Sequence, residues 1–338
     1  MSQPSAVRKV LQLAVRFALV FAAMVMLPVG VAKAIQRSPM PDVSAWVAAR
    51  DARIQLRVFD EETGAVNTMP LNAYILGVLL ANCSPSAPLS SLEAASVAVR
   101  TYAIRAMLHP SPEAQKEHAD VTDNPSLDLS METEHELQLS IGAAAALSFI
   151  SRAQTAIEAT DHQILTYRGQ PILAFLCTIS TGRTRSGEEA LGYPIPYLQS
   201  LPCPADLSSP DRVSTVTYTL GAFNQALSAH LTNFSSLRVT RTHDGFVQSV
   251  KAGETSWSGP AFAARLGLAS DDFTFTVRGD ELVFTCYGRG PDLGMSLHQA
   301  DALAAGGMSY KAILSHFYPG ARLEDLQSQL QRMVTFGN

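Results

Sequence analysis

The sequence predicts an α+β fold in which helices are mixed with antiparallel hairpins. Segments that alternate apolar and polar residues, as half-buried strands do, occur in pairs around turns, at 237–241 with 246–250 and at 273–277 with 282–286. Segments with helical periodicity do not alternate strictly with these strands, which disfavours a doubly wound sheet. The chain has 338 residues, of which 47% are hydrophobic, and can therefore bury a substantial core.

The N-terminus has the features of an export or anchoring signal. Arg8, Lys9 and Arg16 precede an uncharged apolar stretch at 17–32. Positive charge on this flank keeps it in the cytoplasm and directs the remainder across the membrane. The small-x-small pattern at 32–34 is typical of a cleavage site, so a single transmembrane helix and a cleaved signal both stay open.

In the region after the N-terminal signal, the sequence predicts a succession of helices and hairpins. The elements before residue 206 are a strand at 53–59 with a turn at 61–64, a helix from Pro70 through Leu79, a loop from Asn82 to Pro88, a helix at 92–108, a long polar surface loop at 109–136, a helix at 141–160, and a hairpin of 163–167 with 172–177. Those after it are a strand at 215–220, a helix at 222–231, the two hairpins named above, a glycine-rich segment at 288–294, and helices at 296–306 and 310–317.

This order suggests a second, smaller lobe inserted into a larger one. The predicted organisation is a cytoplasmic tip and membrane segment at 1–34, a core at 35–205, an inserted β-rich lobe at 206–286, and the rest of the core with C-terminal helices at 287–338.

Composition and motif spacing exclude several classes of function. A net charge of -5 and a pI near 5.9 give no overall electrostatic reason to expect nucleic-acid binding. The glycines at 288–294 lack the Lys-Ser/Thr of a phosphate loop, and no G-x-S-x-G elbow occurs. The four cysteines form no C-x-x-C pair, so we expect free thiols, no metal and no cofactor.

Three motifs follow one another along the chain. They are MPLNAYILGVLLAN at 69–82 with PLSSLEAASVAVRTYA at 88–103, then AFLCTISTGRTRSGEEALG at 174–192, and GRGPDLGMSLHQA at 288–300. In this order they resemble motifs of the stage II sporulation protein D family, and the similarity extends over nearly all of residues 53–325. Members of that family are peptidoglycan lytic transglycosylases, in which one glutamate donates a proton to the MurNAc-GlcNAc linkage and then assists attack by the C6 hydroxyl.

The sequence departs from the family at positions that carry chemistry. Asn82 stands where the resemblance implies the catalytic glutamate, and an amide cannot give and regain a proton at neutral pH. Cys177 and Pro291 stand where the family has histidines. Glu188 is the first candidate for a substitute acid, and Glu93 is the second. A solvated face or a partner arginine is the simpler explanation of both glutamates.

The resemblance also implies a set of residues that bind the glycan. Arg100 and Tyr102 offer a cation and an aromatic face to a sugar or lactyl group, although a surface arginine braced by an acid is equally consistent. The other expected contacts are hydroxyl and backbone groups of Ser180, Thr181, Gly182, Gly290 and Ser296.

The expected function is therefore a membrane-anchored sporulation protein that acts on septal peptidoglycan glycan strands during engulfment, with weak or no catalysis because Asn82 replaces the acid. Two alternatives stay open: an active transglycosylase with a relocated acid such as Glu188, and a non-enzymatic glycan-binding or scaffold module. The resemblance implies partnership with stage II sporulation proteins M and P. It also favours a retained single-pass anchor, with most of the chain between the mother cell and forespore membranes.

Overall fold

The computed structural model describes residues 54–326, except for residues 62 and 125–127. These residues lie in one compact unit that spans 47–338. The predicted α+β class is confirmed, because helices combine with small, mostly antiparallel sheets. None of the helices within the described ranges is long and apolar enough to span a membrane, and the predicted anchor at 17–32 lies outside those ranges. The predicted domain boundaries stay a prediction.

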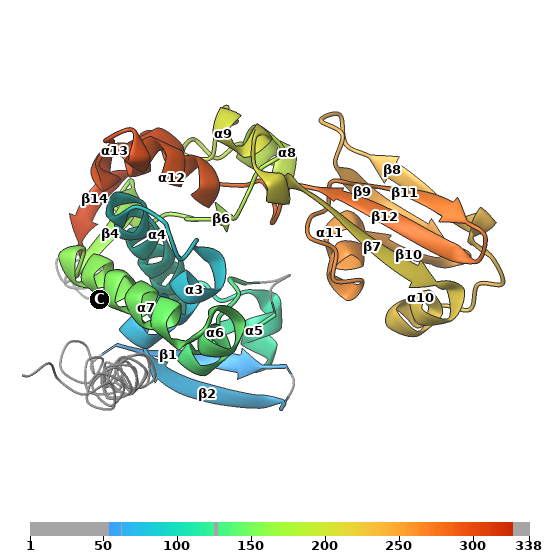
Figure 1. Ribbon diagram of the computed structural model, residues 1–338, viewed down its shortest axis with the longest axis horizontal. Coiled ribbons are helices and arrows are strands. Elements are labelled where there is room, and N and C mark those ends of the chain that lie inside the picture. The colour runs from blue at the N-terminus through green and yellow to red at the C-terminus, as the bar shows by residue number, and fades with distance from the viewer. Residues whose placement is uncertain (1–53, 62, 125–127, 327–338) are drawn as a thin grey trace, which may run out of the picture. The chain divides into compact units, whose positions relative to one another are not determined.

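A group of packed helices forms the interior of the core (Figure 1). Helix α4 (Leu89–Leu108) contacts α3 (Leu71–Asn82) and α7 (Ala143–Ala159), and its residues from Ser91 to Ile104 are buried except for Glu93. Pro70 and Pro88 directly precede α3 and α4, where a proline withholds no needed backbone donor. Because α4 is enclosed by its neighbours, it fixes the position of the loop that joins it to α3.

A small sheet lies beside these helices. Strands β1 (Gln55–Asp60) and β2 (Ala65–Pro70) form the predicted hairpin, and β3 (Val121–Thr122) adds a parallel strand to β1. Arg57 on β1 also binds Asp120, the residue directly before β3. Its guanidinium lies 2.6 Å from the nearly buried Asp120 carboxylate.

The prediction of a long loop at 109–136 is wrong in part. The segment contains a short helix, α5 (Pro112–Lys116), the strand β3, and the start of α6 (Glu134–Ile141). Both helices begin at capped ends: the Ser111 hydroxyl accepts the Ala114 amide, and Thr133 closes a capping box. The predicted 141–160 helix is confirmed as α7, which Gly142 separates from α6.

The predicted hairpin at 163–177 is confirmed only at its turn. Strand β4 (Gln163–Tyr167) pairs with β5 (Gln170–Pro171) across Arg168 and Gly169, both with positive φ, as in a two-residue hairpin turn. The chain then leaves this sheet, whose other strand is β14 (Arg322–Asp325), and β6 (Leu176–Cys177) pairs in parallel with β13 (Met295–Ser296). The end of the predicted 172–177 strand therefore belongs to a different sheet.

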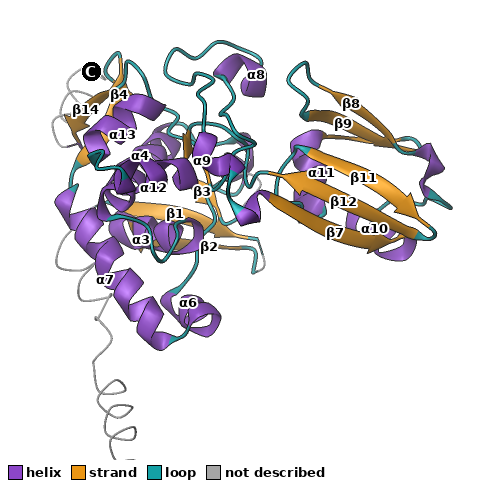
Figure 2. Cartoon of the chain, turned by 45° about the horizontal axis from the view of Figure 1, so that its top comes forward, coloured by secondary structure: helices purple, strands orange, loops and turns teal. Residues whose placement is uncertain are grey.

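Residues 213–287 form a lobe with its own apolar core. Strand β12 (Glu281–Tyr287) lies between β7 (Val213–Thr219) and β11 (Phe273–Arg278), as Figure 2 shows. In a second sheet, β9 (Val247–Ala252) lies between β8 (Arg238–Arg241) and β10 (Thr255–Ser258). Both predicted hairpins are confirmed, whereas β10 was missed.

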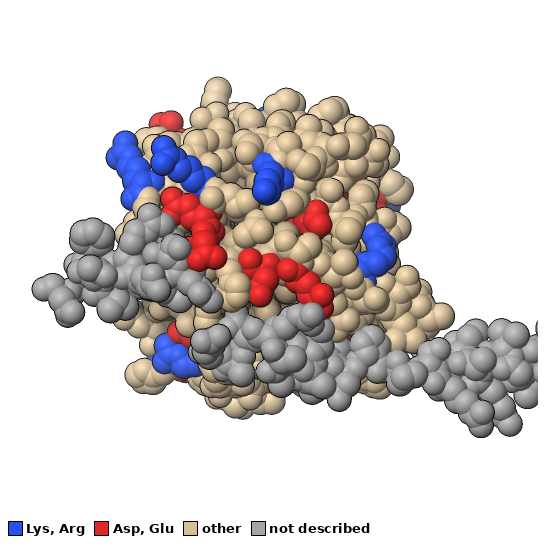
Figure 3. Space-filling view, turned by 90° about the vertical axis from the view of Figure 1, so that its left-hand side faces the viewer, with Lys and Arg blue, Asp and Glu red and all other residues tan. Residues whose placement is uncertain are grey.

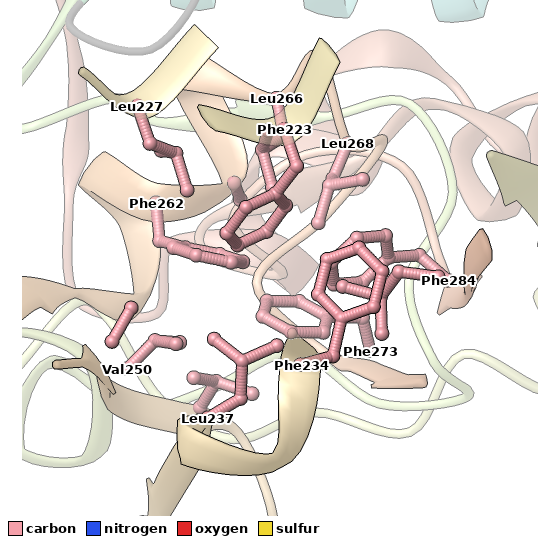
Figure 4. Packing of buried hydrophobic residues seen from close by; sticks show 14 of the residues in the cluster. Phe223, Leu227, Phe234, Leu237, Val250, Phe262, Leu266, Leu268, Phe273 and Phe284 are labelled. Carbon is pink, nitrogen blue, oxygen red and sulfur yellow. The ribbon is translucent and has the colours of Figure 1, made fainter. Parts of the chain in front are cut away.

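Helices and aromatic rings fill the space within this lobe. Helices α10 (Leu220–Leu227) and α11 (Gly259–Arg265) contribute Phe223 and Phe262, and sequence reasoning missed α11. The Phe262 ring stacks on Phe273 at 5.7 Å, and Phe284 meets Phe273 edge-on at 5.5 Å (Figure 4). A clustered aromatic interior of this kind stabilises the lobe independently of the core helices.

The lobe begins and ends at adjacent points of the core. A 3-10 turn at Pro210–Arg212 leads into β7, and the Gly288 amide donates to the Arg212 carbonyl at 2.8 Å directly after β12. The remaining core elements include α8 (Gly187–Leu191), α9 (Pro204–Leu207), α12 (Leu297–Ala305) and α13 (Tyr310–Phe317), and the last two confirm the predicted C-terminal helices.

Candidate functional site

Asn82 is the last residue of α3, and its side chain is held by two backbone carbonyls. Its Nδ2 donates to the Val78 carbonyl at 2.8 Å and to the Ser130 carbonyl at 2.9 Å. The two acceptors use both amide hydrogens, so only the Oδ1 atom of this partly exposed side chain is left to meet a ligand. Asn82 can therefore accept a hydrogen bond from a sugar, but it has no proton to transfer.

The loop that follows Asn82 is held from α7. Arg152 donates to the carbonyls of Pro85, at 2.9 Å, and of Ala87. The loop joins α3 to α4, so position 82 lies between two helices of the core rather than on a free surface segment.

The second and third motifs lie against each other, as the resemblance implies. Met295 pairs with Leu176 and Ser296 with Cys177 in the parallel β6–β13 ladder. Gly290 fits closely on β6, since a Cβ atom there would lie 3.1 Å from the Cys177 Cβ. Gly294 fits more closely still, since its Cβ would lie 2.0 Å from the Phe175 carbonyl oxygen. Glycine is required in this segment for backbone packing as well as for its positive φ.

A buried carboxylate on α9 connects these two motifs. One oxygen of Asp206 accepts the Ser180 amide at 2.8 Å, the Ser180 hydroxyl, and the Ser296 hydroxyl at 2.7 Å. The Gly182 amide in turn donates to the Ser180 hydroxyl. Ser180 and Ser296 are completely buried, and these hydrogen bonds give both side chains a structural role. Their predicted contact with a glycan is not supported by this position.

Asp292 holds the other side of the Ser180 turn. Its Oδ2 accepts the Thr181 amide at 3.0 Å, whereas its Oδ1 is buried without a hydrogen-bond partner among the described residues. Burial raises the pKa of Asp292 to about 7, against hydrogen bonds from Thr181 that lower it and the charges of Asp271 and Asp272 that raise it further. Thr181 and Gly182 are partly exposed on this turn, so both stay accessible to a ligand.

Replacement of Asp292 by asparagine should stabilise the protein at alkaline pH. Because the folded pKa lies above the ordinary value of 3.8, the folded state holds a proton that the unfolded state has lost, and wild-type stability falls as pH rises from about 4 to 7. An asparagine keeps the acceptor for Thr181 and never ionises. We expect Asp292→Asn to melt at a higher temperature than wild type at pH 8.5 and at a similar temperature at pH 4.

Thermal unfolding followed by circular dichroism checks this expectation. Asp280→Asn, in the exposed turn between β11 and β12, makes the same chemical change and should leave the pH dependence unaltered. A lower melting temperature for Asp292→Asn at pH 8.5 would contradict the role assigned to burial.

The structure gives Arg100 a place in the interior. Its side chain is 1% exposed, and it donates to the carbonyls of Thr160 at 2.8 Å, Gln163 at 3.2 Å and Ile157 at 3.3 Å. These carbonyls lie at and beyond the C-terminal end of α7, where a cation compensates the helix dipole. Arg100 thus fixes α7 to α4, and its position does not support the predicted contact with a glycan.

Tyr102 is also engaged within the core. Its hydroxyl donates to the carboxylate of Asp128, which also accepts the backbone and hydroxyl groups of Thr122. Its ring lies 6.2 Å from that of Phe175 in the second motif. Tyr102 is 9% exposed, so it contributes to the packing between motifs and leaves little surface for stacking on a sugar.

The two predicted substitute acids lie on different elements. Glu188 is exposed on α8, where it lines a cavity of about 340 Å³ with Pro194, Pro196 and Gln199. Helix α8 is well separated from α3 in both Figure 1 and Figure 2. Glu93 is partly exposed on α4, and burial raises its pKa. The structure therefore does not bring Glu188 and Asn82 into one site.

The structure also describes the four cysteines and the charges on one face of the molecule. All four cysteines are free, and burial raises the pKa of Cys177 and Cys203, so their thiols stay protonated. Within the described part of the chain, no group of three or more metal-ligating side chains occurs. On the face seen in Figure 3, basic side chains are scattered among uncharged and acidic ones, without a continuous basic patch.

Sequence reasoning missed several residues that build this region. Asp206 and Asp292 join motifs that are distant in sequence, and Arg185 connects the second motif to the lobe through Asp244 at 3.2 Å and Asp271 at 3.4 Å. The positive φ of Asp292 and its place in a glycine-rich segment could have indicated a special position, whereas nothing in the sequence around Asp206 distinguishes it from an ordinary residue in the first turn of a helix.

Known proteins resemble this chain along most of its length. Residues 59–167 match the family described as Stage II sporulation protein. Stage II sporulation protein D of Bacillus subtilis is 28% identical over 284 residues, covering 83% of this chain and 82% of the relative, and that of Bacillus amyloliquefaciens is 27% identical over 287 residues, covering 84% and 83%. An uncharacterised protein of Brachyspira hyodysenteriae is 27% identical over 270 residues, covering 77% and 68%.

The family model covers the first motif, and the matches to the two Bacillus proteins extend over more than four fifths of the chain. Together they show that this chain is similar to stage II sporulation protein D over most of its length, which agrees with the resemblance of the three motifs.

Proposed function

We propose that this chain acts on the glycan strands of septal peptidoglycan during sporulation, and that residue 82 does not supply the catalytic acid. The observation that carries the second part is the engagement of both Asn82 amide hydrogens by the Val78 and Ser130 carbonyls. The first part is supported by the retained packing of the second motif on the third. A glycan engaged at position 82 meets an acceptor oxygen and finds no proton donor on that side chain.

The loss of an acid at this position has a large expected effect on catalysis. General acid–base catalysis contributes roughly 10²–10⁴-fold to a rate, or about 3–5 kcal/mol of barrier. A chain without any substitute acid is therefore a glycan-binding protein with at most weak cleavage.

The proposed location and partners follow from the N-terminal segment and the family. A positively charged flank followed by an apolar stretch suits a membrane anchor that leaves the remaining chain extracytoplasmic, between the mother cell and forespore membranes. In that location, stage II sporulation proteins M and P are the proposed partners.

Sedimentation with glycan strands tests the proposal. The full chain, purified in mild detergent, is mixed with amidase-treated peptidoglycan that lacks stem peptides, and we expect most of the protein to sediment with the strands. Bovine serum albumin in the same detergent serves as the control for trapping. A chain that stays in the supernatant at every strand concentration would exclude glycan engagement.

The role of position 82 is tested by Asn82→Ala. Because the wild-type amide has no proton to transfer, we expect any yield of anhydro-MurNAc ends to fall by less than tenfold in this variant. A fall of about 10²-fold or more, with sedimentation unchanged, would assign the chemistry to residue 82 after all.

A further inference from the structure

The cavity of about 340 Å³ beside α8 lies around the end of the second motif. Its volume is at the small end of the range for ligand pockets and suits one long side chain better than a whole cofactor. Pro194, Ile195, Pro196 and Leu198 form its apolar part, and Glu188 is the carboxylate among its lining residues. A small apolar cavity with one acid has the composition of a binding site for a single charged side chain.

The cavity is held in shape by contacts between α8 and the loop that follows it. The Gly187 amide donates to the Leu198 carbonyl at 2.9 Å, and a Cβ atom at Gly187 would lie 2.8 Å from the Ile195 Cβ. The Thr184 hydroxyl, just before α8, donates to the Gln199 carbonyl at 3.0 Å. Since these contacts close the loop onto α8, the cavity is formed before a ligand arrives, which lowers the entropic cost of binding.

Glu188 gives the cavity its charge. It is exposed, and within the described part of the chain its carboxylate has no hydrogen bond or ion pair. Helix α8 needs one carboxylate for its capping box, and Glu189 supplies it by accepting the Ser186 amide at 2.7 Å. Arg183, which donates to the hydroxyl of the lining residue Ser200, lies 3.0 Å from Glu189, so these two charges compensate each other. The negative charge of Glu188 is left unbalanced.

The cavity offers mainly hydrogen-bond acceptors. The ionised Glu188 carboxylate can only accept, and the Gln199 side-chain amide donates to the Pro196 carbonyl at 3.1 Å, which leaves its oxygen available. Pro194 and Pro196 have no backbone N–H to offer. A ligand that fits must therefore supply donors, a positive charge and an apolar stem. The arginine side chain has all three, because its guanidinium has several N–H donors and no acceptor, and its stem is aliphatic.

Exposed apolar side chains flank these lining residues along the chain. Tyr193, directly before Pro194, is 54% exposed, and Leu191 at the end of α8 is 37% exposed. An exposed tyrosine near a carboxylate suits a guanidinium, which stacks on aromatic faces as well as binding acids. Residues 191–196 include no charged side chain, so a peptide can lie along them without the loss of an ion pair.

We propose that this cavity docks an arginine side chain from an extended segment of a partner protein, and that Glu188 selects the cation. Charge complementarity decides the class of partner. The stem peptides of peptidoglycan also carry amino groups, but their carboxylates would meet the unbalanced charge of Glu188, which favours a protein segment. Helix α8 lies apart from α3, so this docking is independent of glycan engagement at Asn82.

Binding of a short peptide tests the proposal. The full chain, fluorescently labelled and in mild detergent, is titrated by microscale thermophoresis with Gly-Pro-Arg-Pro-Gly, capped at both ends and held extended by its prolines. The control peptide has citrulline, which keeps the shape of arginine and lacks its charge. We expect the arginine peptide to bind below about 1 mM and at least about tenfold more tightly than the citrulline peptide, because its hydrogen bonds are charge-assisted.

Three variants separate this site from the general attraction of a cation to an acidic protein. Glu188→Gln should bind both peptides equally and keep the wild-type melting temperature, because this carboxylate takes no part in the capping box. Glu254→Gln, a matched loss of an exposed carboxylate between β9 and β10, should keep the preference for arginine. Glu188→Lys should reverse the selection, so that Gly-Pro-Glu-Pro-Gly binds more tightly than the arginine peptide.

The other outcomes count against the proposal. No binding up to about 1 mM, equal affinity for both peptides, or a preference that survives Glu188→Gln would overturn it. So would loss of the preference in Glu254→Gln, since overall charge would then be the cause. Displacement of the peptide by peptidoglycan with intact stem peptides would assign the cavity to their amino groups, and self-association abolished by Glu188→Gln would make a second copy of this chain the occupant.

Discussion

Replacement of Gly294 by alanine should destabilise the folded protein by more than about 4 kcal/mol, a loss seen only when a specific steric or electrostatic requirement is broken. The added Cβ would lie 2.0 Å from the Phe175 carbonyl oxygen and 2.7 Å from its carbon, and both are backbone atoms that cannot rotate away. Relief requires β13 to separate from β6, which would also break the pairing of Met295 with Leu176. Thermal and urea unfolding of the full chain measure the loss.

Gly169→Ala is the matched control for this substitution. Gly169 has a φ of 77° and Gly294 a φ of 78°, but nothing lies within 4 Å of a Cβ at Gly169. The control therefore measures the positive φ alone, which should cost about 1–2 kcal/mol. If both variants lost the same stability, close packing of the third motif on the second would not be the reason for Gly294.

Replacement of Arg185 by methionine should cost about 3–5 kcal/mol at pH 8. The side chains of Arg185, Asp244 and Asp271 are each less than a tenth exposed, and the guanidinium also lies 3.9 Å from the centroid of the Phe246 ring. Methionine fills similar volume but leaves the buried Asp271 carboxylate without its cation and leaves Asp244 only the more distant Arg183, at 3.9 Å. Loss of a buried partner is far more costly than the loss of an exposed ion pair. Because the Asp244 loop and Asp271 belong to the lobe, the variant should also loosen the lobe from the core.

The loss for Arg185→Met should become smaller at low pH. Burial raises the pKa of Asp271 to about 6 even in the presence of Arg185, whose charge lowers it, so the carboxyl is neutral below that pH and needs no cation. Melting temperatures at pH 5 and pH 8 measure this difference. Arg183→Met is the control, since its ion pair with Glu189 is about one-third exposed and worth about 0–1 kcal/mol, and it lies at the longer distance of 3.9 Å from Asp244. An equal loss for both arginines would argue against burial as the cause.

The parts of the fold that follow short-range patterns could be predicted from the sequence. Strands β11 and β12 are six and seven residues long, enough for the alternation of apolar and polar side chains to be visible. Helix α4 was predicted from the helical spacing of its apolar residues. In contrast, β3 and β5 have two residues each, too few to show any period. Because β3 could not be recognised, the polar segment at 109–136 was predicted as one long loop.

The candidate site could be predicted in its position but only in part in its contacts. The resemblance pointed to Asn82 and to the glycine-rich segment as candidate site residues, whereas the β6–β13 pairing that joins the second and third motifs is visible only in the structure. The burial of Arg100 could not be foreseen, because its carbonyl acceptors come from α7 and the start of β4, some sixty residues away. Asp206 likewise acquires its partners only through tertiary packing.

The meeting of Gly288 with Arg212 has an evolutionary consequence. A segment whose ends lie next to each other can be lengthened or shortened with little movement of the residues on either side, provided that the carboxylates that pair with Arg185 are kept. Strand pairs and aromatic residues between those ends are therefore free to diversify as one module. Related proteins can therefore differ in this lobe while the core around the three motifs keeps its fold.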